Sequence, residues 1–311
     1  MTFEQLKAEW ENDSPYIVCH TSGSTGTPKS IRLPKNEMLN SARRTSEFFN
    51  LSPSSHLHSC VAADFIGGKM MLVRAILNRC VFTCEKPSNR PLENYSGRDI
   101  DLLSVVPSQL IHILNNPEHL PVIHNILVGG APLMPDLKER IILSGIPVYE
   151  SYGMTETSSH IALRKVEEGK DFFQTLPGIK VFDAGDSCLG ISIEGWMDFI
   201  TNDIAQIKND TEFKILGRID NVIISGGLKI HPETLENRLS PAFSFPFFIT
   251  SRPDSKWGER VVIAVAGITP SDEKITETCR SLLLPHEVPK EVVRLKEIPL
   301  TSNGKIKRCK L

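Results

Sequence analysis

The sequence predicts a protein with a large α/β domain followed by a small α+β domain. Segments typical of strands and of helices alternate up to about residue 150, which favours a sheet flanked by helices. From about residue 177, short strands alternate with turns instead. The chain of 311 residues is long enough for two hydrophobic cores. We place the boundary after residue 217, so that the domains span 1–217 and 218–311.

In the first domain, proline and glycine mark several element boundaries. Pro107 suits the first position of a helix, and Gly145 suits the residue after one. The segment from Asp64 is expected to begin with a glycine turn and to continue as a helix to Leu77. Strands are expected over 16–20, 31–33, 58–63, 80–84, 102–106, 125–128 and 148–150, and further helices over 35–50, 107–115 and 136–144. Ligands of such sheets bind beyond the carboxyl ends of strands, where Gly129-Gly130 and 151–157 lie.

The second part of the chain predicts shorter elements. Pro232 marks the start of one helix, over 232–239, and a second helix is expected over 271–284. Strands are expected over 190–193, 198–201, 213–216, 222–224, 261–265 and 291–295.

Composition and charge exclude several classes of protein. The formal charge of −2 gives no bulk attraction to nucleic acid or to an anionic membrane, and no apolar run approaches membrane-spanning length. The acidic, amphipathic N-terminus does not resemble a signal peptide. The seven cysteines are scattered and contain no C-x-x-C pair; Cys80 and Cys84 could ligate a metal, but no second pair completes a site. Free thiols in a reducing cytoplasm are therefore expected.

The segment from Thr21 to Lys29 is the strongest candidate for a binding site. Two glycines, five hydroxyl side chains and a lysine lie between two short apolar segments that predict a hairpin: Thr21, Ser22, Gly23, Ser24, Thr25, Gly26, Thr27 and Lys29. The glycines let backbone N–H groups point outward, and the hydroxyls and lysine add donors and positive charge. The segment is suited to binding a polyphosphate, although its spacing is not that of a Walker P-loop.

The same segment resembles the phosphate loop of the adenylate-forming superfamily, which includes acyl-CoA synthetases, luciferases and adenylation domains of peptide synthetases. Further blocks resemble the superfamily in its order: Gly129-Gly130-Ala131, Ser151-Tyr152-Gly153-Met154-Thr155-Glu156-Thr157, Thr201-Asn202-Asp203, Gly217-Arg218-Ile219-Asp220, Gly226-Gly227-Leu228-Lys229 and Pro299 to Lys305. The resemblance implies the adenylate-forming fold. The chain begins only twenty residues before Thr21, whereas typical members carry a much longer N-terminal region. We therefore expect a truncated N-terminal domain and a minimal enzyme.

The resemblance implies roles for these residues. Tyr152 would stack on adenine beside Gly129, Gly130 and Ala131, Thr155 would meet the α-phosphate, and Glu156 would hold Mg²⁺. Asp203 would bind the ribose. Asn202 stands where the superfamily usually has glycine, so the resemblance does not predict the turn at this position. Arg218 belongs to the ATP set, Asp220 would be the hinge, and Gly226, Gly227 and Lys229 would face coenzyme A. Lys305 would be the catalytic lysine.

Several segments are more similar to the o-succinylbenzoate–CoA ligases of menaquinone synthesis. These are Val106 to Leu110, Ser151 to Ser159 and Gly217 to Ile230. The similarity implies conversion of o-succinylbenzoate, ATP and CoA to the CoA thioester, AMP and diphosphate through an acyl-adenylate. The acid would contact Phe65, Gly68, Lys69, Ser158 and Ser159, with Lys69 holding the non-reacting carboxylate.

Other functions remain open from the sequence. They are another aryl- or acyl-CoA ligase, an adenylation protein that loads a carrier-protein thiol, and a nucleotide-binding remnant without activity. The resemblance also leaves open a homodimer or another partner that replaces the shortened region.

Overall fold

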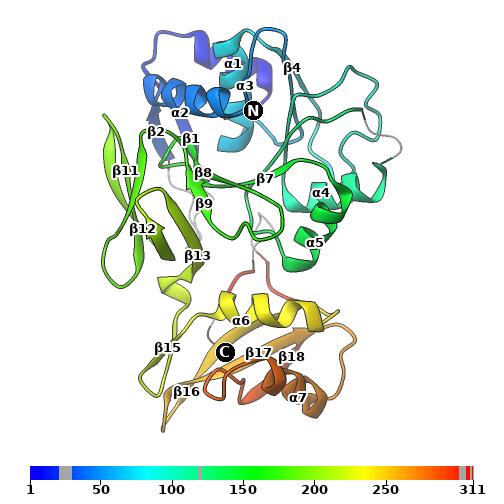
Figure 1. The fold of residues 1–311 in the computed structure, drawn as a ribbon, viewed down its shortest axis with the longest axis vertical. Helices are drawn as coiled ribbons and strands as arrows, with labels where there is room; N and C mark the ends of the chain where they lie inside the picture. The colour runs from blue at the N-terminus through cyan, green and yellow to red at the C-terminus, as the bar shows by residue number, and fades with distance from the viewer. Residues whose placement is uncertain (21–29, 118–120, 301–305, 309, 311) are drawn as a thin grey trace. The chain divides into compact units, whose positions relative to one another are not determined.

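The computed structural model describes residues 1–20, 30–117, 121–300, 306–308 and 310 (Figure 1). These residues form two compact units. The first comprises 1–133, 137–180 and 193–197, and the second comprises 134–136, 181–192 and 198–311. Among the described residues, no helix is both long enough and apolar enough to cross a membrane.

The first unit is built on a sheet with five parallel strands at its centre. Adjacent strands pair in the order β7, β6, β5, β3, β4, and β8 and β9 extend the sheet in antiparallel pairing beyond β7. Every residue of β3, β5 and β6 is buried, as expected for parallel strands covered on both faces. The strands are β3 (His56–Ser59), β4 (Val81–Cys84), β5 (Leu102–Val105), β6 (Ile126–Val128), β7 (Val148–Met154), β8 (Ser159–Lys165) and β9 (Phe173–Thr175).

The helices of this unit pack in two separate apolar clusters. Met38, Ala42, Met70 and Val73 belong to the cluster that joins α1 (Phe3–Glu11), α2 (Lys35–Phe48) and α3 (Ile66–Asn78). Leu110, Ile113, Leu137 and Ile141 belong to the cluster of α4 (Pro107–Asn115) and α5 (Pro135–Ser144). Figure 1 shows α1, α2 and α3 gathered together, apart from α4 and α5. A separate hairpin is formed by β1 (Tyr16–His20) and β2 (Ser30–Pro34).

Two boundaries before α3 differ from those predicted. The predicted strand over 58–63 ends at Ser59, because the apolar residues that follow belong to the connection into α3 and not to the ladder. The predicted glycine turn lies inside α3, which begins at Ile66. A Cβ on Gly68 would come within 2.1 Å of the Ala62 carbonyl oxygen, so this glycine permits a close approach of the helix to that backbone.

The second unit contains a four-strand segment and a smaller mixed sheet. The four-strand segment has the order β10 (Ile179–Asp183), β11 (Cys188–Ile193), β12 (Met197–Asn209), β13 (Glu212–Arg218). The mixed sheet contains β14 (Ile223–Ser225), β15 (Leu228–Ile230), β16 (Phe247–Asp254), β17 (Gly258–Ala266) and β18 (Glu291–Leu295). Strand β17 pairs antiparallel with β14 and β16 and parallel with β18.

Two helices cover an apolar core on the mixed sheet. Leu235 and Leu239 come from α6 (Pro232–Leu239), and Ile275 and Cys279 come from α7 (Asp272–Leu282). They join Ile249 of β16 and three residues of β17 in one buried cluster. Short 3-10 turns at Ile219–Asn221 and Ser240–Ala242 complete this unit. The chain thus has the expected α/β region followed by the expected α+β region.

Candidate active site

The predicted phosphate-binding segment, Thr21 to Lys29, lies outside the described residues, as does Lys305. The strands on either side of the segment are described. β1 and β2 pair antiparallel, with His20 opposite Ser30 at the end of the ladder. The predicted hairpin pairing of the flanking strands is therefore confirmed, and the roles of Thr21 to Lys29 and of Lys305 stay predictions.

The block from Ser151 to Ser159 forms the junction between β7 and β8. The strand runs four residues further than predicted, to Met154, because Ser151 to Met154 pair with β8. The chain then turns at Thr155 and Glu156, where Ser158 N donates to Thr155 O at 3.0 Å. A Cβ on Gly153 would lie 2.3 Å from the Cα of His160, so only glycine fits this crossing. Tyr152, Thr155 and Glu156 are half-buried at the carboxyl end of β7.

The predicted adenine segment begins at the carboxyl end of β6, next to β7. The Ser151 hydroxyl donates to Val128 O at 3.0 Å, and a Cβ on Gly129 would lie 2.6 Å from that hydroxyl oxygen. Gly130 has φ +90°, a conformation that favours glycine. Gly129, Gly130 and Ala131 therefore lie beside the Ser151 block, as their predicted shared site requires.

The second unit brings two sequence-distant blocks together. Asp203 of β12 lies opposite Arg218 of β13 in the ladder, and their Oδ1 and Nη1 atoms are 3.4 Å apart. The Arg218 Nη2 is 3.3 Å from Asp220 Oδ2, and Asn202 Nδ2 donates to the same oxygen at 3.3 Å. Asn202 lies within β12, so the residue that replaces the usual glycine occupies a regular strand. Arg218 thus lies between the predicted ribose carboxylate and the predicted hinge.

The predicted glycine loop is a two-residue hairpin turn. Ser225 pairs with Leu228, so Gly226 and Gly227 occupy the turn between β14 and β15, with φ +59° and +81°. Positive φ at both central residues is the geometry of a type I′ turn, which strongly favours glycine. Lys229 Nζ lies 2.8 Å from Asp186 Oδ1, and its hydrogen bond to that carboxylate raises the pKa of Lys229.

The predicted acyl residues lie on α3 and β8 or on the residue directly before each of them. Phe65 is half-exposed at the start of α3, whereas Lys69 is buried, with Nζ 3.3 Å from Met1 Sδ. Ser158 is buried in a left-handed conformation, φ +61°, and its hydroxyl has no hydrogen-bond partner among the described residues. Ser159 is buried beside it and contacts a residue that the sequence interpretation did not include.

That residue is Arg74 of α3. It is 1% exposed, its Nη2 donates to Ser159 Oγ at 3.1 Å, and its Nε has no hydrogen-bond partner in the described part of the chain. Burial lowers the pKa of Arg74 to about 9. Burial, and then the charge of Arg74, lower the pKa of the adjoining His160 well below its usual range. A buried guanidinium with a free donor is a ready partner for an anionic group.

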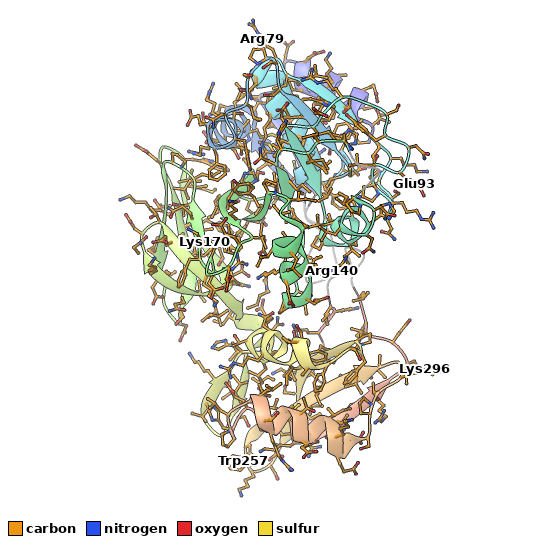
Figure 2. All side chains as sticks on the ribbon, turned by 45° about the vertical axis from the view of Figure 1, so that its right-hand side comes forward. Arg79, Glu93, Arg140, Lys170, Trp257 and Lys296 are labelled. Atoms are coloured by element: carbon orange, nitrogen blue, oxygen red, sulfur yellow. The ribbon has the colours of Figure 1, made fainter. Side chains whose placement is uncertain are left out.

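A cavity of about 560 Å³ lies elsewhere on the first unit, lined by Leu114, Ile123, Arg140, Leu143 and neighbouring residues, none of them a predicted site residue. Figure 2 labels Arg140. We assign it no part in the site.

Comparisons with known proteins identify the family. A model of the AMP-binding enzyme family matches residues 3–183, and a model of the AMP-binding enzyme C-terminal domain matches 248–305. The chain is 26% identical to a 2-succinylbenzoate–CoA ligase of Listeria monocytogenes, over 99% of this chain and 72% of the relative. It is 28% identical to the Bacillus cereus ligase of the same name, over 98% of this chain and 71% of the relative.

Solved structures show the same fold. An AMP-forming acyl-CoA synthetase-like protein of Dyadobacter fermentans is 33% identical, with TM-score 0.64, and the match covers 97% of this chain and 90% of that one. The o-succinylbenzoate CoA synthetase of Bacillus subtilis, in complex with ATP and magnesium, is 21% identical, with TM-score 0.82. The match covers 94% of this chain and 68% of that one. The adenylate-forming fold predicted from the sequence is confirmed. The chain belongs to the AMP-binding enzyme family.

Proposed function

We propose that this protein is an ATP-dependent acid–CoA ligase that acts on o-succinylbenzoate. It would form an acyl-adenylate and diphosphate, and then the CoA thioester and AMP. The observation that carries the proposal is the similarity of 98–99% of the chain to relatives named 2-succinylbenzoate–CoA ligase. The predicted nucleotide residues Gly129 to Ala131 and Ser151 to Glu156 lie together at the carboxyl ends of adjacent strands, which supports it.

In the first half-reaction, the acid's carboxylate attacks the α-phosphorus of ATP. The transition state gathers negative charge, so positioning and electrostatics supply most of the catalysis. Lys305 and the Thr21–Lys29 segment would provide positive charge and donors, and Asp203 would hold the ribose. Glu156 fits a Mg²⁺ ligand, because it presents a half-buried carboxylate at the β7–β8 turn and Mg²⁺ prefers oxygen ligands. Bound Mg²⁺ would neutralise phosphate charge.

The acid's second carboxylate needs a positive partner. Arg74 is buried beside Ser158 and Ser159, two predicted acyl residues, and its Nε has no described partner. It is therefore a second candidate for this role besides Lys69, which is also buried on α3. A guanidinium can bind a carboxylate with two parallel hydrogen bonds, which an ammonium cannot.

In the second half-reaction, the C-terminal domain would rotate about Asp220. Lys305 would leave the site, and the turn at Gly226 and Gly227, with Lys229, would face the CoA thiol as it displaces AMP. A short hinge can absorb a large rotation through a few backbone dihedrals. The domain boundary after residue 217 and the rotation of the C-terminal domain are both parts of this proposal.

Product analysis tests the proposal. CoA-dependent release of AMP, with o-succinylbenzoyl-CoA as the product, would support it. AMP release that requires a carrier protein would indicate an adenylation protein instead, and a thioester with another acid would indicate a different CoA ligase.

We also propose a cytoplasmic location, in keeping with the six described cysteines, all of which are free. A homodimer remains a prediction that size-exclusion chromatography with light scattering can test.

A further inference from the structure

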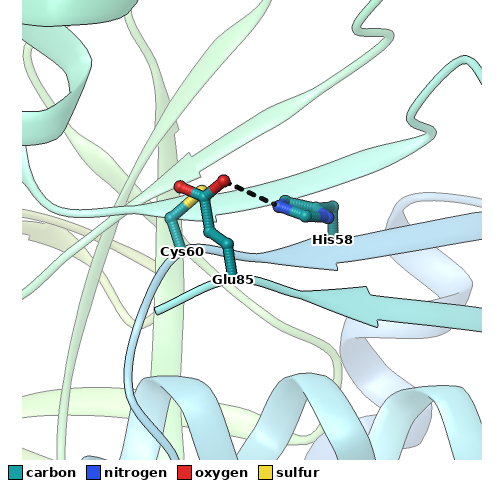
Figure 3. Close-up of side chains that lie close together, drawn as sticks. All are labelled: His58, Cys60 and Glu85. Atoms are coloured by element: carbon teal, nitrogen blue, oxygen red, sulfur yellow. Dashed lines mark ion pairs between the residues drawn. The ribbon is translucent and has the colours of Figure 1, made fainter. Parts of the chain in front are cut away.

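His58, Cys60 and Glu85 converge at the carboxyl ends of β3 and β4 (Figure 3). The parallel register pairs His58 with Thr83 and Ser59 with Cys84, so Cys60 and Glu85 follow their strands side by side. One ligand atom from each side chain lies within 4.8 Å of the other two, and His58 Nε2 is 3.7 Å from Glu85 Oε2. The His58 side chain is 3% exposed, that of Glu85 is 25% exposed, and Cys60 is fully buried.

A chain of hydrogen bonds determines which nitrogen of the neutral His58 ring carries the proton. The Asp99 carbonyl can only accept, so His56 Nδ1 donates to it at 2.9 Å. A neutral His56 then accepts at Nε2 from the Thr83 hydroxyl, at 2.6 Å. The Thr83 oxygen is left to accept from His58 Nδ1, at 2.7 Å. In its neutral form, His58 therefore presents a lone pair at Nε2 toward Glu85. In the opposite tautomer of His58, Nδ1 would accept from the Thr83 hydroxyl. Both nitrogens of His56 would then have to donate, which requires a charged His56 at a position only 1% exposed.

This lone pair lacks a donor. His58 Nε2 is buried and has no hydrogen-bond partner among the residues that the structure describes. The Glu85 carboxylate, 3.7 Å away, cannot donate when it is ionised. A nitrogen lone pair, a carboxylate and a thiol facing one another form a set of ligands for a cation.

We propose that His58, Cys60 and Glu85 bind a zinc ion. Imidazole nitrogen, thiolate sulfur and carboxylate oxygen are all zinc ligands, whereas Mg²⁺ and Ca²⁺ prefer oxygen alone. Ligand atoms on a tetrahedral zinc lie about 3.3–3.7 Å apart, given the usual bond lengths. The 3.7 Å between His58 Nε2 and Glu85 Oε2 is a few tenths of an ångström longer than the ~3.3–3.5 Å of a nitrogen–oxygen pair on zinc. Rotation about the side-chain bonds of Cys60 and Glu85 would bring the three ligand atoms onto one ion. Water takes the fourth position.

The surrounding residues act as an outer shell. Thr83 holds the His58 ring through Nδ1, and the Leu92 backbone N–H donates to both Glu85 oxygens at 3.2 Å. Such outer partners fix the orientation of metal ligands. The ion would join the ends of β3 and β4 just before the connection to α3. Its three ligands are separate from every residue assigned to ATP, magnesium or the acid in the proposed function.

Cobalt substitution tests the site directly. The full-length protein is stripped of metal with a chelator and titrated with Co²⁺, which takes zinc's geometry and gives a thiolate-to-cobalt charge-transfer band. We expect one equivalent to produce this band and one equivalent of Zn²⁺ to abolish it. Glu85→Gln and Thr83→Val, neither of which removes the thiol, should each weaken Co²⁺ binding by about 10- to 100-fold. Both replacements conserve side-chain volume at partly exposed positions.

Cysteine variants identify the sulfur ligand. Cys60→Ser should lose the band while keeping the circular dichroism spectrum of the parent. Cys84→Ser is the matched control, since Cys84 is an exposed thiol next to Glu85 and should be dispensable. If the parent shows no thiolate band, or if the band survives Cys60→Ser and disappears in Cys84→Ser, the proposed site is wrong. An unchanged Co²⁺ affinity in both Glu85→Gln and Thr83→Val would also overturn it, whether or not Cys60→Ser folds.

Discussion

The Arg308 guanidinium binds the Glu236 carboxylate through two hydrogen bonds of 2.6 Å, one to each oxygen. Glu236 also accepts from the Ile249 backbone N–H at 2.7 Å. Burial raises the pKa of Glu236, and the charge of Arg308 opposes that shift. The pair holds Arg308 against α6, and a further hydrogen bond from Arg308 Nη1 to the Ile249 carbonyl, at 3.1 Å, holds it against β16.

Arg308→Leu is expected to destabilise the protein by about 3–5 kcal/mol, because removing one partner leaves a buried carboxylate without its counter-charge. Urea denaturation followed by circular dichroism measures this loss. Arg294→Leu is the control, since the Arg294–Asp272 pair is about half-exposed and should contribute about 0–1 kcal/mol. Equal losses in the two variants would show that the buried pair does not stabilise the fold.

The Arg308→Leu variant should also change how stability depends on pH. Without the guanidinium, the folded-state pKa of Glu236 rises further above its unfolded value, because burial is no longer opposed. A raised carboxyl pKa contributes stability below the unfolded pKa that is lost as pH rises through the folded pKa. The difference in unfolding free energy between parent and variant should therefore grow from pH 4 to pH 7. Adding Glu236→Gln should remove that pH dependence.

Neighbouring glycines of α3 should respond differently to alanine. Gly68→Ala places a Cβ 2.1 Å from the Ala62 carbonyl oxygen, so the helix must move, whereas the nearest atom to a Cβ on Gly67 is 3.8 Å away. We expect Gly67→Ala to be neutral or to stabilise by up to about 1 kcal/mol, as alanine favours the helix. Gly68→Ala should lower the melting temperature. A melting temperature that is equal in the two variants would contradict this packing.

Arg74 should determine binding of the acid. Arg74→Met is expected to raise KM for o-succinylbenzoate by about tenfold or more, since hydrogen bonds to charged groups contribute about 1.5–3 kcal/mol. KM for ATP should change little. Arg79→Lys is the control, because Arg79 is exposed at the end of the same helix (Figure 2). An unchanged KM for the acid in Arg74→Met, with a raised KM in Lys69→Ala, would assign the role to Lys69.

Alanine substitutions in the turn between β14 and β15 should slow thioester formation but not adenylation. Alanine in a left-handed conformation costs about 1–2 kcal/mol, and at Gly226 its Cβ would also lie 2.8 Å from the Trp257 ring. Gly226→Ala should therefore slow thioester formation from a supplied acyl-adenylate more than Gly227→Ala does. Adenylation should be spared in both variants. If adenylation falls as much as thioester formation, the turn does not act in the second half-reaction alone.

Lys305→Ala should nearly abolish formation of the acyl-adenylate, because the lysine would supply positive charge to the transition state. Formation of the thioester from a supplied acyl-adenylate should continue. Rapid-quench measurement of each half-reaction distinguishes the two effects. Equal loss of both would contradict the rotation of the C-terminal domain.

The sequence was most informative where a residue type marks a backbone position. Pro107 and Pro232 marked the first residues of α4 and α6, and both helices have the predicted bounds. It was least informative where pairing decides the structure. The predicted strand ends at residue 150, yet Ser151 to Met154 continue it by pairing with β8. Ala63 is apolar, yet it lies beyond the end of β3.

Residues of the candidate active site could be predicted from the sequence only where they belong to a recognisable motif. The Asp203–Arg218–Asp220 contacts need the register of β12 on β13, which composition does not provide. The cluster of His58, Cys60 and Glu85 likewise depends on the register of β3 and β4, whereas cysteine spacing directed attention to Cys80 and Cys84. Arg74 resembled any polar helix residue, because nothing in its type signals burial.

The most direct test of the proposed function is diphosphate release with ATP, Mg²⁺ and o-succinylbenzoate, with and without CoA, beside a panel of benzoates and fatty acids. We predict release specific to o-succinylbenzoate, with its CoA thioester as the product when CoA is present. Release with another acid alone would contradict the assigned substrate. No release with any acid, from protein that still binds ATP, would contradict the assignment as a ligase.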